Sequence, residues 1–477
     1  MSATLQVLSA DDRAELHERS LRVLSEVGMR VDSDAGRRIL KDAGARVDEA
    51  TRIVRIPAAL VEESLALAPR RFSLGGRDPG FEFPLNAGQA TLLNGGGGEE
   101  IVDYRSGQTR LATRDDWAQI TRLIDALPEI GVGWVGAGHW TYADTPTPAV
   151  AVAEAAETTR LFSRHQNTSF DEPELVPWWL ETLALVHGGR EEVARRHPVS
   201  FLFCPVSPLI VEGPSFDTWL ALRGWDIPVW VMPMPLMGAT SPGSRLGTIL
   251  STNCEVLGML CLVQAAEPGT PFVYAPIIAT VDPRSGRYAG GAGLTVLSCG
   301  GTEMARHYDL PVCSHSFSCD AWVPGAQAAY EKAFGMLLAG LSWPDILVGA
   351  GVLGGGLSFG LEQLVIDVEI WRMVRAAHDG VAAGADRWLD DVLAAVGPGG
   401  NFLGERSTRR AMRGEEWFVP RLGTQDAREA WEAAGRPDVV EEARQKVADI
   451  LATHETPPYD DDVARELAAL VARAARG

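Results

Sequence analysis

Side chains that can do chemistry follow the carboxyl ends of short apolar runs along this 477-residue chain. Asn94 closes an early run, Tyr274 lies at the end of a later one, and His315 and Asp320 follow a run that ends at Ser314. If the runs are parallel strands of one barrel, their carboxyl ends meet at one face and the residues behind them share a cavity. We therefore expect a functional site at that face.

Aromatic residues are frequent at the same positions. A quaternary ammonium ion is held by the faces of aromatic rings and by an acid rather than by hydrogen bonds. Taken singly, each ring is better explained as filling of the barrel, so the rings carry weight only as a group. The candidates for such a cage are Trp134, Trp140, Phe203, Tyr274, Phe317 and Trp322.

Three other kinds of site have little support in the spacing of residues. His139, His165 and His315 follow different runs without an HxH or HxxxH spacing, so we interpret each as a structural histidine and expect no bound metal. The chain has no GxSxG motif, which leaves acyl transfer without a sequence signal. Residues 349–354 match GxGxxG, but they fall in the last repeat and continue as two further glycines, so we expect no bound NAD.

The glycines at 95–98 have two interpretations that the sequence leaves open. Without a Cβ the backbone could approach a ligand closely. The same glycines could equally form a sharp turn that contacts no ligand.

The middle of the chain repeats a short apolar run followed by a helical pattern, about every 30–45 residues, which is the length of a βα unit. Continuous apolar runs are typical of strands buried on both faces, hence of a parallel sheet. Eight such units predict an α/β fold, a (β/α)8 barrel of the TIM type, with an open doubly wound sheet as the alternative. The runs cover residues 90–94, 131–136, 165–169, 199–204, 227–232, 271–275, 310–314 and 345–350.

Two flanking regions differ in pattern from the repeats. Residues 1–88 read as an N-terminal α+β lobe, with an alternating edge strand at 51–56. Residues 385–477 are charged and read as a helical C-terminal extension that packs outside the barrel or on a neighbouring subunit. The barrel itself is expected over residues 89–384.

Composition narrows the classes of function. The net charge of −20 argues against a nucleic-acid partner. No run of eighteen apolar residues and no basic start followed by an apolar run is present, so we expect neither a membrane span nor a secretory signal. The six cysteines form no CxxC pair and are expected as free thiols, which fits a cytoplasmic location.

Long ordered motifs lie at 103–107, 113–116, 207–209, 233–242, 253–255, 269–274, 282–286, 327–332 and 361–370. They extend over nearly the whole chain and resemble the trimethylamine methyltransferase family. The resemblance implies a (β/α)8 barrel that moves a methyl group from an amine to the Co(I) centre of a separate corrinoid protein. Some members carry pyrrolysine, and others lack it and are similar to the glycine betaine enzymes; this chain has only standard residues.

One segment departs from the family pattern. Where members usually have Ser/Thr-Asp-Ser-Lys followed by an acid, this chain reads Cys319-Asp-Ala-Trp322, with Gly325 in place of the acid. A quaternary amine already leaves as a neutral tertiary amine, so it needs no acid. The protein must hold the cation, aim one methyl group at cobalt, and avoid over-stabilising a charge that the reaction discharges.

The leading hypothesis is therefore a corrinoid-dependent methyltransferase for a betaine-like quaternary amine, in a homo-oligomer whose open barrel mouth docks its cognate corrinoid protein. The alternatives are a barrel lyase or hydrolase that lost corrinoid chemistry, and a non-catalytic protein that binds quaternary amines. We assign Asp320, His315 and Glu255 to catalysis and Gly95, Gly96, Gly97 and Gly354 to corrinoid contact. The substrate-binding candidates are Asn94, Trp134, Trp140, Phe203, Tyr274, Trp322, Gln327 and Glu362.

Overall fold

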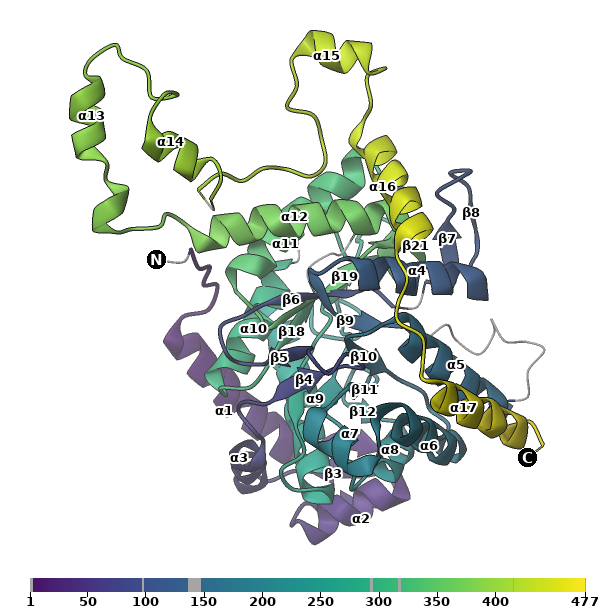
Figure 1. The fold of residues 1–477 in the computed structure, drawn as a ribbon. Helices are drawn as coiled ribbons and strands as arrows, with labels where there is room; N and C mark the ends of the chain where they lie inside the picture. The colour runs from purple at the N-terminus through teal and green to yellow at the C-terminus, as the bar shows by residue number, and fades with distance from the viewer. Residues whose placement is uncertain are drawn as a thin grey trace.

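The barrel is the central feature of the computed structural model, which describes residues 3–96, 98–135, 147–291, 295–315, 319–414 and 416–476. Its eight parallel strands are ordered β15-β13-β11-β10-β9-β6-β19-β18 (Figure 1). A parallel bridge between Tyr274 and Val312 joins the two outer strands and closes the ring. The strands are β6 (Thr91–Asn94), β9 (Ile130–Trp134), β10 (His165–Thr168), β11 (Val199–Phe203), β13 (Val229–Val231), β15 (Phe272–Tyr274), β18 (Cys313–His315) and β19 (Ile346–Ala350).

Each strand is followed by a helix on the outside of the ring, so the predicted (β/α)8 barrel is confirmed. A capping box precedes the first of these helices, since Thr113 Oγ accepts from Asp116 N and the Asp116 carboxylate accepts from Thr113 N. Two further helices, α7 (Arg190–Arg196) and the short η2 (Pro173–Leu175), flank the third unit. In chain order the helices are α4 (Arg114–Ala126), α5 (Thr147–Leu161), α6 (Val176–His187), α8 (Gly213–Ala221), α9 (Arg245–Ala266), α10 (Thr295–His307), α11 (Ala326–Leu341) and α12 (Leu361–Asp379).

The α9 helix is long and apolar enough to cross a membrane. Most of its apolar window is buried inside the protein, between the barrel and the N-terminal helices. Its composition is therefore that of a core helix. Among the described residues it is the one helix that meets the length and hydropathy criteria.

Alternation along the strands sorts their side chains into two layers, because successive residues point to opposite faces. Leu202, Trp230 and Val273 lie in the cluster that fills the barrel interior. Their neighbours Phe203 and Tyr274 belong to the larger cluster between the strands and the helices. Residues in continuous apolar strands thus divide between an inner and an outer core.

The N-terminal region packs around the barrel rather than beside it. Helices α1 (Ala10–Glu26), α2 (Asp34–Asp42) and α3 (Ala58–Leu67) contact α9. A hairpin of β4 (Ser73–Gly75) and β5 (Glu82–Pro84) contributes Leu74 and Phe83 to the interior cluster. A four-stranded sheet, ordered β12-β1-β3-β2, combines β1 (Met29–Val31), β2 (Arg46–Asp48) and β3 (Ile53–Arg55) with β12 (Ile210–Val211) from the loop after β11.

The loops at the carboxyl ends of the barrel strands form small sheets of their own. One is ordered β14-β16-β17 and the other β20-β21-β7-β8, so loops that follow different strands are tied together. Each of these two sheets therefore joins loops that follow two different barrel strands. The strands are β7 (Glu100–Val102), β8 (Thr109–Leu111), β14 (Leu236–Met237), β16 (Ala279–Val281), β17 (Tyr288–Ala289), β20 (Val352–Leu353) and β21 (Ser358–Gly360).

The C-terminal extension contains two packed helices and an exposed part. Helix α16 (Val439–Thr453) packs on α12 and α4, and α17 (Asp461–Ala474) packs on α5 and α6, so both lie against the outer helices of the barrel. Before them come η4 (Ala385–Arg387), α13 (Asp390–Val396), α14 (Arg406–Ala411) and α15 (Arg428–Ala433), which project from the body (Figure 1).

Candidate functional site

A cavity of about 390 Å³ opens where β10, β11 and β13 end. Leu202 and Cys204 lie on its inner side, where strand alternation turns them toward the barrel interior, and Met234 and Leu236 form an apolar wall. The cavity lies at the face of the barrel where a (β/α)8 enzyme carries its active site.

Two carboxylates line this cavity. Asp171 follows β10 and accepts a hydrogen bond from Ser215 Oγ, while Glu212 immediately precedes α8. Both side chains belong to exposed residues, so water reaches them. Two negative charges beside an apolar floor favour a cation with an apolar surface. Sequence reasoning did not single out either acid, because each lies in a loop beyond the end of its strand.

Beneath the cavity a buried polar column supports the floor. The His165 ring stacks on Trp230 at 6.3 Å between centroids, and its Nε2 contacts Ser200 Oγ at 2.8 Å. Its Nδ1 lies 3.0 Å from the carbonyl oxygen of His197, which makes Nδ1 the protonated nitrogen. Burial lowers the pKa of His165 to about 3, so the ring is neutral. His165 is therefore a hydrogen-bonded structural residue, and no group of three potential metal ligands is found among the described residues.

Asp320 ties two rim loops together on the opposite side of the mouth. Its carboxylate accepts hydrogen bonds from the backbone N–H groups of Gly290 and Gly291, each at 3.0 Å. Its own N–H donates to Glu331 at 2.7 Å, and Glu331 also accepts from Gln327 Nε2 at 2.9 Å. Asp320 and Gln327 are thus brought together through Glu331, a residue that the sequence analysis missed. Glu331 lies one helical turn after Gln327, and that i,i+4 spacing was the available signal.

Trp322 lies on the same rim with 46% of its surface exposed. A Cβ at Gly354 would come within 2.7 Å of its indole ring, and Arg287 lies 6.0 Å from the ring centroid. Gly354 has φ +58°, a left-handed conformation that glycine adopts without strain. The glycine therefore makes room for Trp322.

His315 ends β18 close to a buried ion pair. Lys332 Nζ lies 2.8 Å from Asp367 Oδ2, and both side chains are fully buried. Asp367 also accepts from Gly351 N at 2.7 Å and from Gln363 Nε2 at 2.8 Å. Burial, and then the charge of Lys332, lowers the pKa of His315 to about 4. His315 is consequently neutral at neutral pH and is no proton donor there.

Asn94 joins two barrel strands instead of facing the cavity. Its Oδ1 accepts from Trp134 N at 2.8 Å and its Nδ2 donates to Trp134 O at 3.0 Å. Trp134 itself packs against the interior cluster. A Cβ at Gly96 would come within 2.1 Å of the Trp134 ring, and one at Gly95 within 1.7 Å of Val352. These glycines make room for side chains of the chain itself.

Three further candidates lie away from the mouth. Phe203 and Tyr274 point to the helix layer because of strand alternation, and the Tyr274 hydroxyl donates to Asn253 of α9. Glu362 is buried at the start of α12 against Arg444 of α16, at 3.3 Å. The structure therefore does not bring these three residues to the cavity. Trp140 and Gly97 lie outside the described residues.

Glu255 holds the loop that forms one wall of the cavity. Its carboxylate accepts from Ser207 Oγ at 2.7 Å and from Leu209 N at 3.0 Å. Burial raises its pKa to about 7, although both hydrogen bonds act in the opposite direction. Ser207 lines the cavity, so Glu255 positions the cavity wall from behind.

This pKa predicts a pH-dependent stability. The folded protein holds the Glu255 proton more tightly than the unfolded chain, whose value is 4.5. The stability associated with Glu255 is therefore present below pH 4.5 and is lost as the pH rises through about 7, by up to about 3 kcal/mol. We expect Glu255→Gln to flatten urea-unfolding stability between those pH values. The exposed Glu63→Gln serves as control, and an E255Q profile parallel to that of the wild type would contradict the prediction.

Comparison with known proteins gives consistent matches over the full chain. A family model described as Trimethylamine methyltransferase (MTTB) matches residues 1–477. Trimethylamine methyltransferase MttB2 of Methanosarcina mazei is 32% identical, with 99% of this chain and 96% of that protein covered. Glycine betaine methyltransferase of Desulfitobacterium hafniense is 24% identical, with 98% and 96% covered.

Among solved structures, the monomethylamine methyltransferase MtmB of Methanosarcina barkeri covers 92% of this chain and 92% of its own. The identity is 13% and the TM-score 0.48. The barrel assignment rests on the strand order and its closure rather than on this likeness.

Proposed function

The chain belongs to the trimethylamine methyltransferase family, and on that premise we propose that it transfers a methyl group from a betaine-like quaternary amine to the Co(I) centre of a separate corrinoid protein. Membership makes the chain an amine methyltransferase, which speaks against the lyase, hydrolase and non-catalytic alternatives. The proposal concerns the kind of amine and the methyl acceptor.

The acidic cavity at the mouth is the observation that carries the choice of substrate. A trimethylammonium group presents apolar methyl groups around a permanent charge, and the cavity offers Leu202 and Met234 together with the carboxylates of Asp171 and Glu212. Hydrated acids attract the cation without holding its charge in a dry pocket. This is favourable because the reaction discharges the substrate, and a strong ground-state interaction would oppose it.

Because it is neutral, His315 supplies no proton to a leaving amine. Removal of a methyl group from a tertiary amine releases a neutral secondary amine only if the nitrogen takes up a proton. A quaternary amine releases a neutral tertiary amine without any proton transfer. Burial and Lys332 keep His315 unprotonated. Catalysis by this chain then consists of binding the cation, orienting one methyl group toward the open mouth and limiting the access of water.

The rim fits the approach of a corrinoid protein. Bound Co(I) supplies the nucleophile that accepts the methyl group. Exposed apolar side chains follow four different barrel strands, and such residues gathered at one face are typical of docking surfaces. Gly95 accommodates Val352, Gly96 accommodates Trp134 and Gly354 accommodates Trp322. The proposal therefore assigns docking to side chains of the rim rather than to these glycines. The rim side chains are Val206, Met234, Trp322, Val323 and Leu357.

The test is methyl transfer to free cob(I)alamin. We expect the purified protein to form methylcobalamin, seen by its absorbance, with at least one of glycine betaine, carnitine, choline or proline betaine. Dimethylglycine and trimethylamine serve as matched tertiary amines. Turnover of trimethylamine with none of the quaternary amines, or no turnover of any of them, would overturn the proposal.

A further inference from the structure

Quaternary amines of the size that fits the cavity at the mouth differ in the group at their second end. A betaine carries a carboxylate there, whereas a quaternary ammonium alcohol such as choline carries a neutral hydroxyl group. Both kinds present the same trimethylammonium head to Leu202 and Met234. The charges and hydrogen-bonding groups around that head therefore decide which kind is bound more tightly.

The charges at the cavity oppose a carboxylate on the substrate. Asp171 and Glu212 both line the cavity, and both residues are exposed. Each of these carboxylates attracts the head of either ligand but repels the second end of a betaine. At a separation of about 6 Å in water, repulsion between two unit charges lowers affinity by about threefold for each acid.

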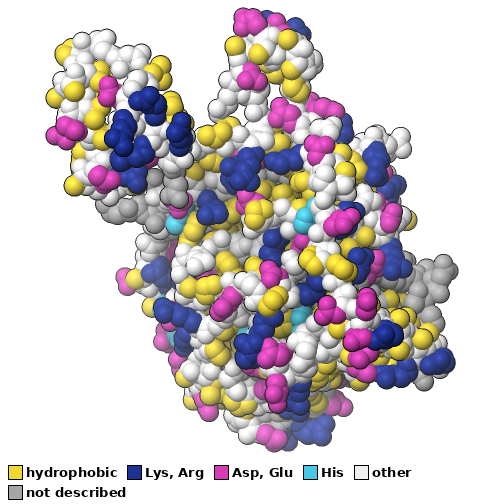
Figure 2. Space-filling view, viewed as in Figure 1, with side chains coloured by type: hydrophobic (Ala, Val, Ile, Leu, Met, Phe, Trp, Pro, Cys, Tyr) yellow, Lys and Arg dark blue, Asp and Glu magenta, His cyan; other side chains and the backbone are white. Residues whose placement is uncertain are grey.

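The cavity also lacks a cation that could pair with such a carboxylate. None of the described residues that line it is a lysine or an arginine. Segments 136–146, 292–294 and 316–318, which lie outside the described residues, contain neither residue type. Arg287 lies beside Trp322, on the other side of the mouth. Lysine and arginine side chains are nevertheless spread over the face of the molecule in Figure 2, so cations are not scarce on this protein.

Hydroxyl groups of the cavity suit an alcohol. Thr240 Oγ accepts a hydrogen bond from Leu236 N at 2.8 Å, so its own proton can still be donated. Ser207 Oγ donates to the Glu255 carboxylate at 2.7 Å, so its lone pairs can still accept. An alcohol both donates and accepts, whereas a carboxylate only accepts. An alcohol can therefore use both kinds of group, and a carboxylate only one.

We propose that this cavity favours quaternary ammonium alcohols over zwitterionic betaines of similar size. The inference rests on the proposed function for the trimethylammonium head and names the second end that the same site prefers. A betaine still binds through its head, as the weaker ligand. Asp171 and Glu212 are the residues that determine this preference.

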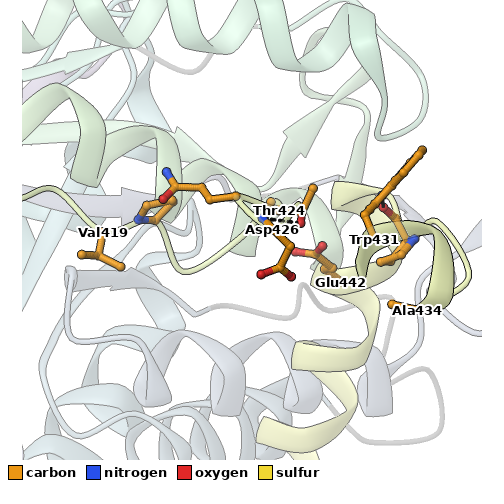
Figure 3. Close-up of a pocket in the computed structure, with 10 residues that line it drawn as sticks. Val419, Thr424, Asp426, Trp431, Ala434 and Glu442 are labelled. Atoms are coloured by element: carbon orange, nitrogen blue, oxygen red, sulfur yellow. Dashed lines mark hydrogen bonds between the residues drawn. The ribbon is translucent and has the colours of Figure 1, made fainter. Parts of the chain in front are cut away.

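A second hollow offers similar chemistry and has to be distinguished from the first. It lies beside α15, has a volume of about 310 Å³ and is lined by Trp431, Asp426 and Glu442 (Figure 3). An indole face next to carboxylates also attracts a quaternary ammonium ion. Its two acids therefore provide the matched control variant, Asp426→Asn/Glu442→Gln.

The test is calorimetric titration of the full chain with choline and with glycine betaine at low salt. We expect the Kd of choline to be about tenfold lower, with a smaller difference at high salt. The two Kd values should approach each other in Asp171→Asn/Glu212→Gln and keep the wild-type ratio in D426N/E442Q. Tighter or equal binding of glycine betaine by the wild type, binding of neither ligand, or a ratio lost only in D426N/E442Q would each overturn the proposal.

A cation added to the cavity tests the direction of the preference. Val206 lines the cavity with 40% of its surface exposed, so Val206→Lys adds a charge that stays in water. This variant should bind glycine betaine more tightly and choline less tightly than the wild type, whereas Thr424→Lys in the hollow beside α15 should change neither Kd. Unchanged Kd values in V206K would contradict the proposal. Calorimetry needs no corrinoid, so failure of this preference and failure of methyl transfer are distinguishable.

Discussion

Replacing Lys332 by methionine should lower the free energy of unfolding by about 3–5 kcal/mol, because it leaves the buried Asp367 carboxylate without its cation. Two hydrogen bonds from Gly351 and Gln363 remain, but they do not neutralise the charge. The measurement is urea unfolding followed by circular dichroism. The same substitution removes the cation that lowers the pKa of His315, so that pKa should rise from about 4.

Two further variants separate loss of charge pairing from loss of packing. In Lys332→Met/Asp367→Asn no uncompensated charge remains, so we expect most of the lost stability to return. In Arg195→Met an exposed pair with Glu192 is broken, and the loss should stay below about 1 kcal/mol. If K332M alone costs no more than R195M, the buried pair does not stabilise the fold in the way described.

Neutralising the cavity acids should raise the KM for a cationic substrate and leave kcat nearly unchanged. Asp171→Asn and Glu212→Gln each remove one charge near water, which corresponds to about a fivefold increase in KM. The effect should be greater in the double variant and should shrink at high salt, because exposed charges are screened. Steady-state methyl transfer provides both constants.

The control for this pair is Asp115→Asn, which removes an exposed acid of α4 outside the cavity. Its KM should equal that of the wild type. Equal KM values for D171N/E212Q and D115N would show that the cavity does not bind the cation. A fall in kcat at constant KM would assign the acids to the chemical step instead.

The barrel and the sequence of its strands and helices could be predicted, because strands buried on both faces are apolar throughout and alternate with helical patterns. Because such strands are apolar on both faces, the sequence does not show which face of a strand points into the barrel. Phe203 and Leu202 look alike in the sequence, yet one lies outside the ring and the other inside. The assignment of Phe203 and Tyr274 to a cage depended on that unknown orientation.

The rim was predicted in part. Asp320, Trp322 and Gln327 do gather after β18, because the rule that sites follow strand ends depends only on topology. Asp171 and Glu212 were not found, because they lie in loops whose course is set by tertiary packing. The exposure of residues 381–419 could not be predicted either, because their apolar residues have the composition of an ordinary packed helix.

The central claim is that the cavity between β10, β11 and β13 holds the nitrogen of a quaternary amine. A crystal structure with glycine betaine bound tests it most directly. We predict the nitrogen above Leu202 and within about 6 Å of the carboxylate of Asp171 or Glu212. A nitrogen bound instead on the far rim, beside Asp320 and Trp322, would contradict the account.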